Sequence, residues 1–123
     1  MHELAVCQAL IATVENIARR REARVKGVRV AIGPLSGIEP HLLAAAYPLA
    51  CAGTSAEGSL LAVERSELRV RCRSCGAESP VEPNRLLCGA CGDWRTDVVS
   101  GDEMMLLRVE LEVPETALEA HHV

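Results

Sequence analysis

Residues 72–91 read CRSCGAESPVEPNRLLCGAC, and this stretch decides how the rest of the chain is arranged. It contains two Cys-x-x-Cys pairs separated by twelve residues. Each pair can hold one metal ion from a tight turn, and nearby glycines supply the backbone freedom that such turns need. Four thiolates about 2.3 Å from a tetrahedral zinc ion close its coordination shell. The spacing therefore predicts a structural Zn(II) site on Cys72, Cys75, Cys88 and Cys91.

Two other interpretations of the four cysteines stay open at this point. Tetrahedral sulfur also suits iron in a rubredoxin-like site, and the thiols could be free and buried. The segment has little apolar material besides Val81, Leu86, Leu87 and Trp94, so it cannot bury enough surface to fold alone. Metal binding would supply its folding free energy, which disfavours free thiols.

Five arginines lie in or beside this segment: Arg69, Arg71, Arg73, Arg85 and Arg95. A zinc ion with four thiolates has a formal charge of −2, so local charge compensation explains these arginines. A zinc ribbon that binds nucleic acid is the alternative. It is disfavoured because the net charge of the chain is −4 and the segment lacks a set of aromatic residues for base stacking.

The 123 residues suit one compact domain with a small appendage, and 49% of them are hydrophobic. Aromatic residues make up only 2%, so Leu, Val, Ile and Ala must build the core. No apolar run reaches the roughly 20 residues that span a bilayer, and no signal peptide is recognisable. We expect a cytoplasmic protein, where cysteines serve metal or redox chemistry rather than disulfides.

Two helices are predicted from apolar periodicity and proline placement. Apolar residues recur at helical spacing from Leu4 to about Arg24. We interpret Arg19–Arg21 as the solvated end of this helix, where positive charge complements the helix dipole; a docking patch is the alternative. Pro40 fits the first turn of a second helix, which Pro48 should kink or end.

Alternating apolar residues predict strands over residues 28–32 and 105–113. Between residues 61 and 70 the alternation changes parity, which predicts a bulge or a strand that changes faces near Arg65. A strand–helix–strand crossover favours a parallel pair, so the fold class is α+β, with a small three-stranded mixed sheet and two helices. The zinc ribbon is then an inserted domain, residues 71–96, within an α/β domain of residues 1–70 and 97–123.

The chain opens with Met1-His2-Glu3. A lone histidine near a terminus is in most proteins a solvated residue, but His2 is too large for the initiator methionine to be removed. The Met1 amine, the backbone nitrogens of His2 and Glu3, and the His2 imidazole can wrap one ion in fused chelate rings. Such a planar nitrogen set suits Ni(II) or Cu(II), with the Glu3 side chain free to orient the site from outside.

These features together resemble the HypA/HybF family of hydrogenase maturation nickel metallochaperones. The resemblance rests on Met1-His2-Glu3, on the helix start Leu4-Ala5-Val6-Cys7-Gln8-Ala9-Leu10, on Gly33-Pro34-Leu35-Ser36-Gly37-Ile38-Glu39 and on the paired cysteines. It covers the chain up to about Val113. No histidine flanks the cysteine motif, as some relatives have, so this sequence offers no such link between the two metal sites.

The resemblance implies a nickel carrier that delivers its ion to the large subunit of [NiFe]-hydrogenase. It implies that His2 is the key nickel ligand, helped by Met1 and the backbone of Glu3. A HypB-family GTPase is the implied partner, and urease maturation proteins are further candidates. No nucleophile–base pair, carboxylate dyad or phosphate-binding loop is recognisable, so we expect neither enzymatic activity nor nucleotide binding.

The remaining cysteines and histidines have simpler interpretations. Cys7 lies on the apolar stripe of the first helix and is predicted to be a core residue. The role of Cys51 is left open, and His41 should be solvated. His121 and His122 should form a tail that could bind metal adventitiously.

Overall fold

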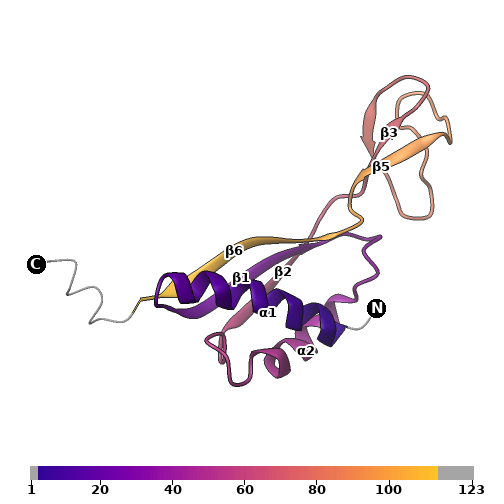
Figure 1. Ribbon diagram of the computed structural model, residues 1–123. Coiled ribbons are helices and arrows are strands. Elements are labelled where there is room, and N and C mark those ends of the chain that lie inside the picture. The colour runs from indigo at the N-terminus through magenta and orange to yellow at the C-terminus, as the bar shows by residue number, and fades with distance from the viewer. Residues whose placement is uncertain (1–2, 114–123) are drawn as a thin grey trace, which may run out of the picture. The chain divides into compact units, whose positions relative to one another are not determined.

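The computed structural model describes residues 3–113 (Figure 1). Its elements, in chain order, are α1 (Glu3–Arg20), β1 (Arg24–Ile32), α2 (Pro40–Cys51), β2 (Leu60–Arg65), β3 (Arg69–Cys72), β4 (Glu78–Pro80), β5 (Thr96–Ser100) and β6 (Met104–Glu112). None of the helices in the described range is long and apolar enough to cross a membrane.

The larger sheet has the strand order β2-β1-β6. Beyond β1, the Gly33 N–H donates to the carbonyl of Glu103 at 3.0 Å, as expected when β6 runs antiparallel to β1. On the other side, β2 runs parallel to β1 after the crossover through α2 (Figure 1). The prediction of a three-stranded mixed sheet with two helices is therefore confirmed.

The first helix ends at Arg20, earlier than the predicted Arg24. Glu22 adopts a left-handed backbone conformation with φ of 51°. The Ala23 N–H then donates to the Ala18 carbonyl at 3.0 Å, which closes the helix in a Schellman-type turn. This turn allows β1 to begin at Arg24 rather than at residue 28.

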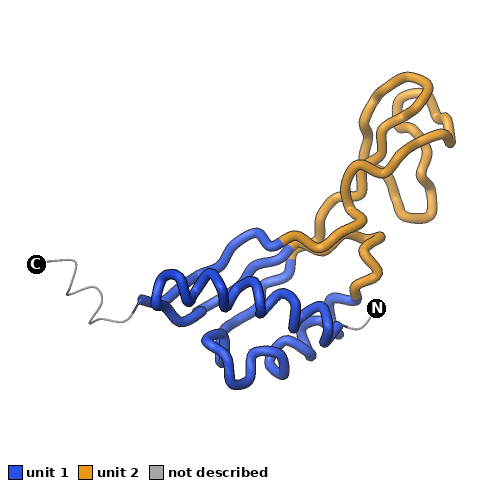
Figure 2. The backbone as a smooth tube through the Cα atoms, in the orientation of Figure 1, with its two compact units in different colours: residues 1–30, 39–63, 106–123 blue, residues 31–38, 64–105 orange. Residues whose placement is uncertain are grey.

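The chain divides into two compact units, which are described separately (Figure 2). The first unit comprises residues 1–30, 39–63 and 106–123, and the second comprises residues 31–38 and 64–105. In the first unit α1 packs against α2. Its most deeply buried side chains come from both helices and β1, and they include Cys7, Val14, Val30, Leu43 and Cys51.

The second unit contains a separate antiparallel sheet in the order β4-β3-β5. Val70 of β3 lies opposite Ser79 on one side and Val98 on the other. The prediction of one bulged or face-changing strand between residues 61 and 70 is therefore wrong. The parity change arises because the chain leaves β2 at Arg65 and enters a different sheet at β3, where Val70 is buried; Leu68, also buried, lies just before β3.

Gly33 has to be glycine because another backbone segment passes very close to it. A Cβ atom on Gly33 would lie 2.1 Å from the carbonyl oxygen of Gly101, far inside van der Waals contact. Gly101 itself has a φ of 99°, which favours glycine. The two glycines place the chain that leaves β1 beside the chain that leads into β6.

Candidate metal centre

The first cysteine pair forms a turn whose amide groups point at a sulfur atom. The backbone N–H groups of Ser74 and Cys75 donate to Cys72 Sγ at 3.3 and 3.4 Å. The Gly76 N–H closes the turn on the Cys72 carbonyl at 3.0 Å, and Gly76 has a φ of 77°. The sequence forms this turn because glycine adopts that φ without strain.

The second pair repeats the same turn. The N–H groups of Ala90 and Cys91 donate to Cys88 Sγ at 3.3 and 3.4 Å. Gly92, with a φ of 76°, donates its N–H to the Cys88 carbonyl at 2.9 Å. Two turns with matching hydrogen bonds each present a pair of thiols to a common point.

The four sulfur atoms of Cys72, Cys75, Cys88 and Cys91 lie within 4.8 Å of one another. The Sγ atoms of Cys72 and Cys91 are 3.6 Å apart, and those of Cys75 and Cys88 are 3.5 Å apart. A tetrahedron of thiolates about 2.3 Å from a metal has edges of about 3.8 Å. The donor set and its spacing therefore fit one tetrahedral metal ion, and the structure brings together all four cysteines that the spacing predicts.

The amide hydrogen bonds also lower the pKa of two of the four thiols. The N–H groups of Cys91 and Ala90 lower the pKa of the Cys88 thiol from 9.0 to about 6. The pKa of Cys72 is lowered as well, first by the N–H of Cys75. Because the thiolate is the form that binds metal, these shifts favour Cys88 and Cys72 as ligands. The pKa of Cys75 is raised, and that of Cys91 is raised to about 12.

Carboxylates, rather than the metal site itself, are the direct partners of most nearby arginines. Arg73 donates to Asp97 with its shortest contact at 2.7 Å, and Arg95 donates to Asp93 at 3.0 Å. Asp93 also accepts a hydrogen bond from the Ser74 hydroxyl, which ties the two cysteine turns together. The pKa of Asp93 is lowered, chiefly by Arg95.

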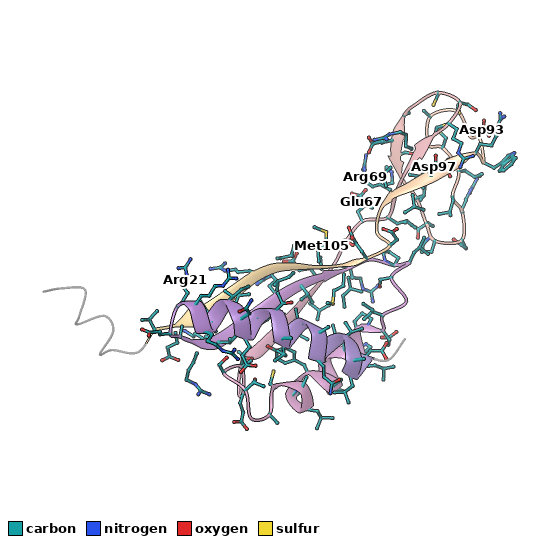
Figure 3. All side chains as sticks on the ribbon, in the orientation of Figure 1. Arg21, Glu67, Arg69, Asp93, Asp97 and Met105 are labelled. Atoms are coloured by element: carbon teal, nitrogen blue, oxygen red, sulfur yellow. The ribbon has the colours of Figure 1, made fainter. Side chains whose placement is uncertain are left out.

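The same pattern continues along β3, where Arg69 pairs with Glu67 (Figure 3). Arg71 pairs with Glu78. These arginines are thus paired with carboxylates, and Arg95 is also attracted by the charges of Cys72 and Cys91, so compensation of the charge of the metal site stays a prediction. Sequence reasoning missed the aspartates: Asp97 lies in β5, whereas Asp93 and Arg95 lie in the irregular segment before it.

Of the predicted N-terminal ligands, Met1 and His2 lie outside the described residues, and Glu3 is the first residue of α1. Glu3 Oε2 accepts a hydrogen bond from the backbone N–H of Glu39 at 3.2 Å. The Glu39 side chain in turn caps α2 by accepting the His41 N–H at 3.2 Å. Glu3 thereby links the start of α1 to the start of α2. Glu39 directly precedes Pro40, where the second helix was predicted to begin, but its contact to Glu3 was not predicted.

The other two cysteines lie in the core of the first unit. Cys7 is fully buried, as predicted, and its thiol donates to the Leu43 carbonyl at 3.5 Å. Burial raises the pKa of Cys7 to about 11, so it stays a thiol at neutral pH. Cys51 is also buried. Among residues 3–113, the four-cysteine cluster is the one group of three or more His, Cys, Asp and Glu side chains arranged to hold a metal ion. His121 and His122 lie outside this range.

Comparison with known proteins shows the family of the chain. The family model described as "HypA: Hydrogenase/urease nickel incorporation, metallochaperone, hypA" matches residues 1–111. The "Hydrogenase maturation factor HypA" of Nitrosospira multiformis is 52% identical over 112 residues, which cover 90% of this chain and 97% of the relative. The protein of the same description from Aquifex aeolicus is 43% identical, over 92% of this chain and 99% of the relative.

A solved structure is similar as well. The solution structure of "the Ni metallochaperone HypA from Helicobacter pylori" matches with a TM-score of 0.71 at 25% identity. The match covers 93% of this chain and 100% of that one. The family description is that of a metal carrier, in agreement with the prediction of a protein that is not an enzyme. The chain therefore belongs to the HypA family of metallochaperones for hydrogenase and urease nickel incorporation.

Proposed function

We propose that this protein carries Ni(II) at its N-terminus and delivers it to the large subunit precursor of [NiFe]-hydrogenase. The observation that best supports a nickel site there is the hydrogen bond from the Glu39 N–H to the Glu3 carboxylate. It holds the residue that follows His2 against the start of α2. Glu3 is the first residue of α1, and the first four N–H groups of a helix have no acceptor within the helix itself.

The proposed nickel chelate uses the Met1 amine, the backbone nitrogens of His2 and Glu3, and the His2 imidazole. Four nitrogen donors in a plane suit Ni(II), which exchanges them for a partner's ligands more readily at an exposed terminus than in a packed core. The Glu3 carboxylate acts on the chelate by fixing the backbone and not by binding the metal.

We further propose that the four-cysteine site holds Zn(II) and serves the fold. Its four thiolates complete a tetrahedral shell, so no position is left for a substrate. The donor set also accepts iron, and metal analysis of protein purified without added metal distinguishes the two ions.

The proposed partners follow from the resemblance to the HypA family. A HypB-family GTPase is proposed to exchange nickel with this chain, as that resemblance implies. The sequence shows no phosphate-binding loop, so any nucleotide dependence would belong to the partner. Urease maturation proteins are proposed as further recipients, in keeping with the description of the family.

Nickel delivery is tested with the hydrogenase large subunit precursor. Protein loaded with radioactive nickel should pass most of its ion to the metal-free precursor, while the His2→Ala variant should load and transfer almost none. Nickel that stays on the carrier in the presence of precursor and GTPase would contradict the proposed delivery.

Replacing Glu3 tests its positioning role. Glu3→Ala removes the acceptor of the Glu39 N–H, so nickel affinity should fall about tenfold, as is typical when a group that orients metal ligands is lost. Glu3→Gln keeps an acceptor oxygen and should stay within about threefold of the original affinity. Competition against a chelator of known affinity measures both variants.

The matched control for this experiment is Glu57→Ala, which removes one exposed carboxylate from the same unit. It should leave nickel affinity unchanged. Equal affinities for Glu3→Ala and Glu57→Ala would show that the contact to Glu39 does not support the nickel site.

A further inference from the structure

Positive charge is concentrated in one short segment of this acidic protein. Six of the 13 lysines and arginines fall within residues 19–29, where Glu22 is the one acidic residue. The segment has a net charge of +5, in a chain whose net charge is −4. A local excess of this size produces a positive potential that the rest of the molecule does not share.

Four of these side chains form an exposed group that we call the basic cluster: Arg20, Arg21, Arg24 and Lys26. Arg20 is the last residue of α1 and Arg21 follows it, and Figure 3 labels Arg21 beside this end of the helix. Arg24 and Lys26 flank the buried Val25 at the start of β1, so both point away from the side of the strand that Val25 packs on. The Schellman-type turn at Glu22 leads directly from α1 into β1, so only Glu22 and Ala23 separate the two pairs along the chain.

The basic cluster has no acidic partner among residues 3–113, since the ion pairs of this range include none of its members. The nearest pairing on the same helix joins Arg19 to Glu15 at 3.9 Å. Four arginines of the second unit behave differently and each contact a carboxylate. Four neighbouring cations that repel one another are a cost to the folded chain, which an acidic ligand would relieve.

We propose that the basic cluster docks an acidic segment of a partner protein. A short peptide with several carboxylates matches the cluster in charge and extent. A longer polyanion such as nucleic acid would meet the remainder of the chain, whose net charge is −9. Within the cluster and its turn there is also no aromatic residue on which a base could stack.

The position of the basic cluster suits a docking surface that is separate from the proposed nickel site. The 18 residues of α1 separate it from Glu3 by about 27 Å. A partner held there leaves the N-terminus accessible. The inference does not depend on nickel, so removing the cluster should weaken docking and leave metal affinity unchanged.

The test measures binding of a fluorescent octaglutamate peptide to the full zinc-loaded chain by anisotropy, at about 50 mM salt where charge contacts are weakly screened. The neutral probe is octaglutamine, and the nucleic acid probe is a single strand of twelve thymidines. The cluster variant replaces all four cations with glutamine: R20Q, R21Q, R24Q and K26Q. The matched control removes four positive charges elsewhere: R65Q, R69Q, R85Q and R108Q. A charge-conserving variant carries R20K, R21K and R24K.

The wild-type chain should bind octaglutamate and not octaglutamine. The cluster variant should bind octaglutamate at least about tenfold more weakly, the matched control within about threefold, and the charge-conserving variant like wild type. Equal losses in the cluster variant and the control would overturn the proposal, because net charge alone would then explain binding. Tighter binding of the thymidine strand, or a salt-sensitive dimer abolished by the cluster substitutions, would assign the surface to nucleic acid or to a second copy instead.

Discussion

Replacing Cys72 with serine should release the metal ion and unfold residues 64–105, while α1 and α2 stay folded. The reason is that this part of the chain has almost no core of its own. Its buried apolar side chains are Leu68, Val70, Cys72 and Cys88, and two of these are the proposed ligands. Binding of a structural zinc ion contributes on the order of 10 kcal/mol, which so small a core cannot replace.

Metal content and amide NMR spectra check this prediction. Cys72→Ser should leave less than about a tenth of the original metal and should collapse the dispersed signals of β3 and β5. The matched control is Cys51→Ser, the same substitution at a buried cysteine of the first unit, and it should keep a full complement of metal. Dispersed β3 and β5 signals in a metal-free Cys72→Ser protein would contradict the proposed role of the site.

Acid should also release the metal, because protons compete with the metal for the cysteine sulfur atoms. The folded chain lowers the pKa of Cys88 from 9.0 to about 6, so its thiolate stabilises the fold fully above pH 9. That contribution is lost as pH falls toward 6, and below 6 protons compete with the metal for the sulfur. Because the bound metal opposes protonation of the sulfur, metal release measured with a colorimetric chelator should begin below pH 6 and rise as the pH is lowered further.

Local patterns were enough to predict the metal site and most of the secondary structure. The four cysteines come from two turns that each lie within a few residues, so their spacing alone fixes the geometry of each pair. The strand predicted over residues 105–113 is close to the observed Met104–Glu112 because alternation reports a half-buried strand directly. Cys7 was correctly placed in the core because it lies on the apolar stripe of a helix, which is also a local pattern.

Contacts between distant segments were not predictable in this way. Glu3 and Glu39 are 36 residues apart, and nothing in either local sequence signals that they meet. The end of α1 was misplaced because Glu22 adopts a conformation that glycine or asparagine usually marks. The parity change after β2 was visible in the sequence, but only the structure shows that the chain enters a second sheet there. Trp94, counted as apolar material, is 74% exposed and adds little to a core.

The second large effect is expected at the N-terminus. Adding Gly-Ser-Gly before Met1 leaves every side chain in place but moves the free amine away from His2. The proposed chelate then loses one of its four nitrogens, and nickel affinity should fall by at least about a hundredfold. Three residues are needed, because one extra residue would place the imidazole third from a new amine and build another four-nitrogen chelate.

Two controls accompany this extension. Both proteins must hold the same amount of zinc, so that the fold is not the cause of any difference. A second variant keeps the native N-terminus and carries His121→Gln and His122→Gln, which removes the two adjacent histidines near the C-terminus. It should bind nickel like the unmodified protein.

The most direct measurement is therefore the nickel stoichiometry and affinity of the native and extended proteins, each determined by competition with a chelator. The native protein should bind about one high-affinity nickel ion, and the extended protein should lose it. Equal binding by the two forms would contradict the N-terminal site, and nickel would then have to be carried elsewhere on the chain.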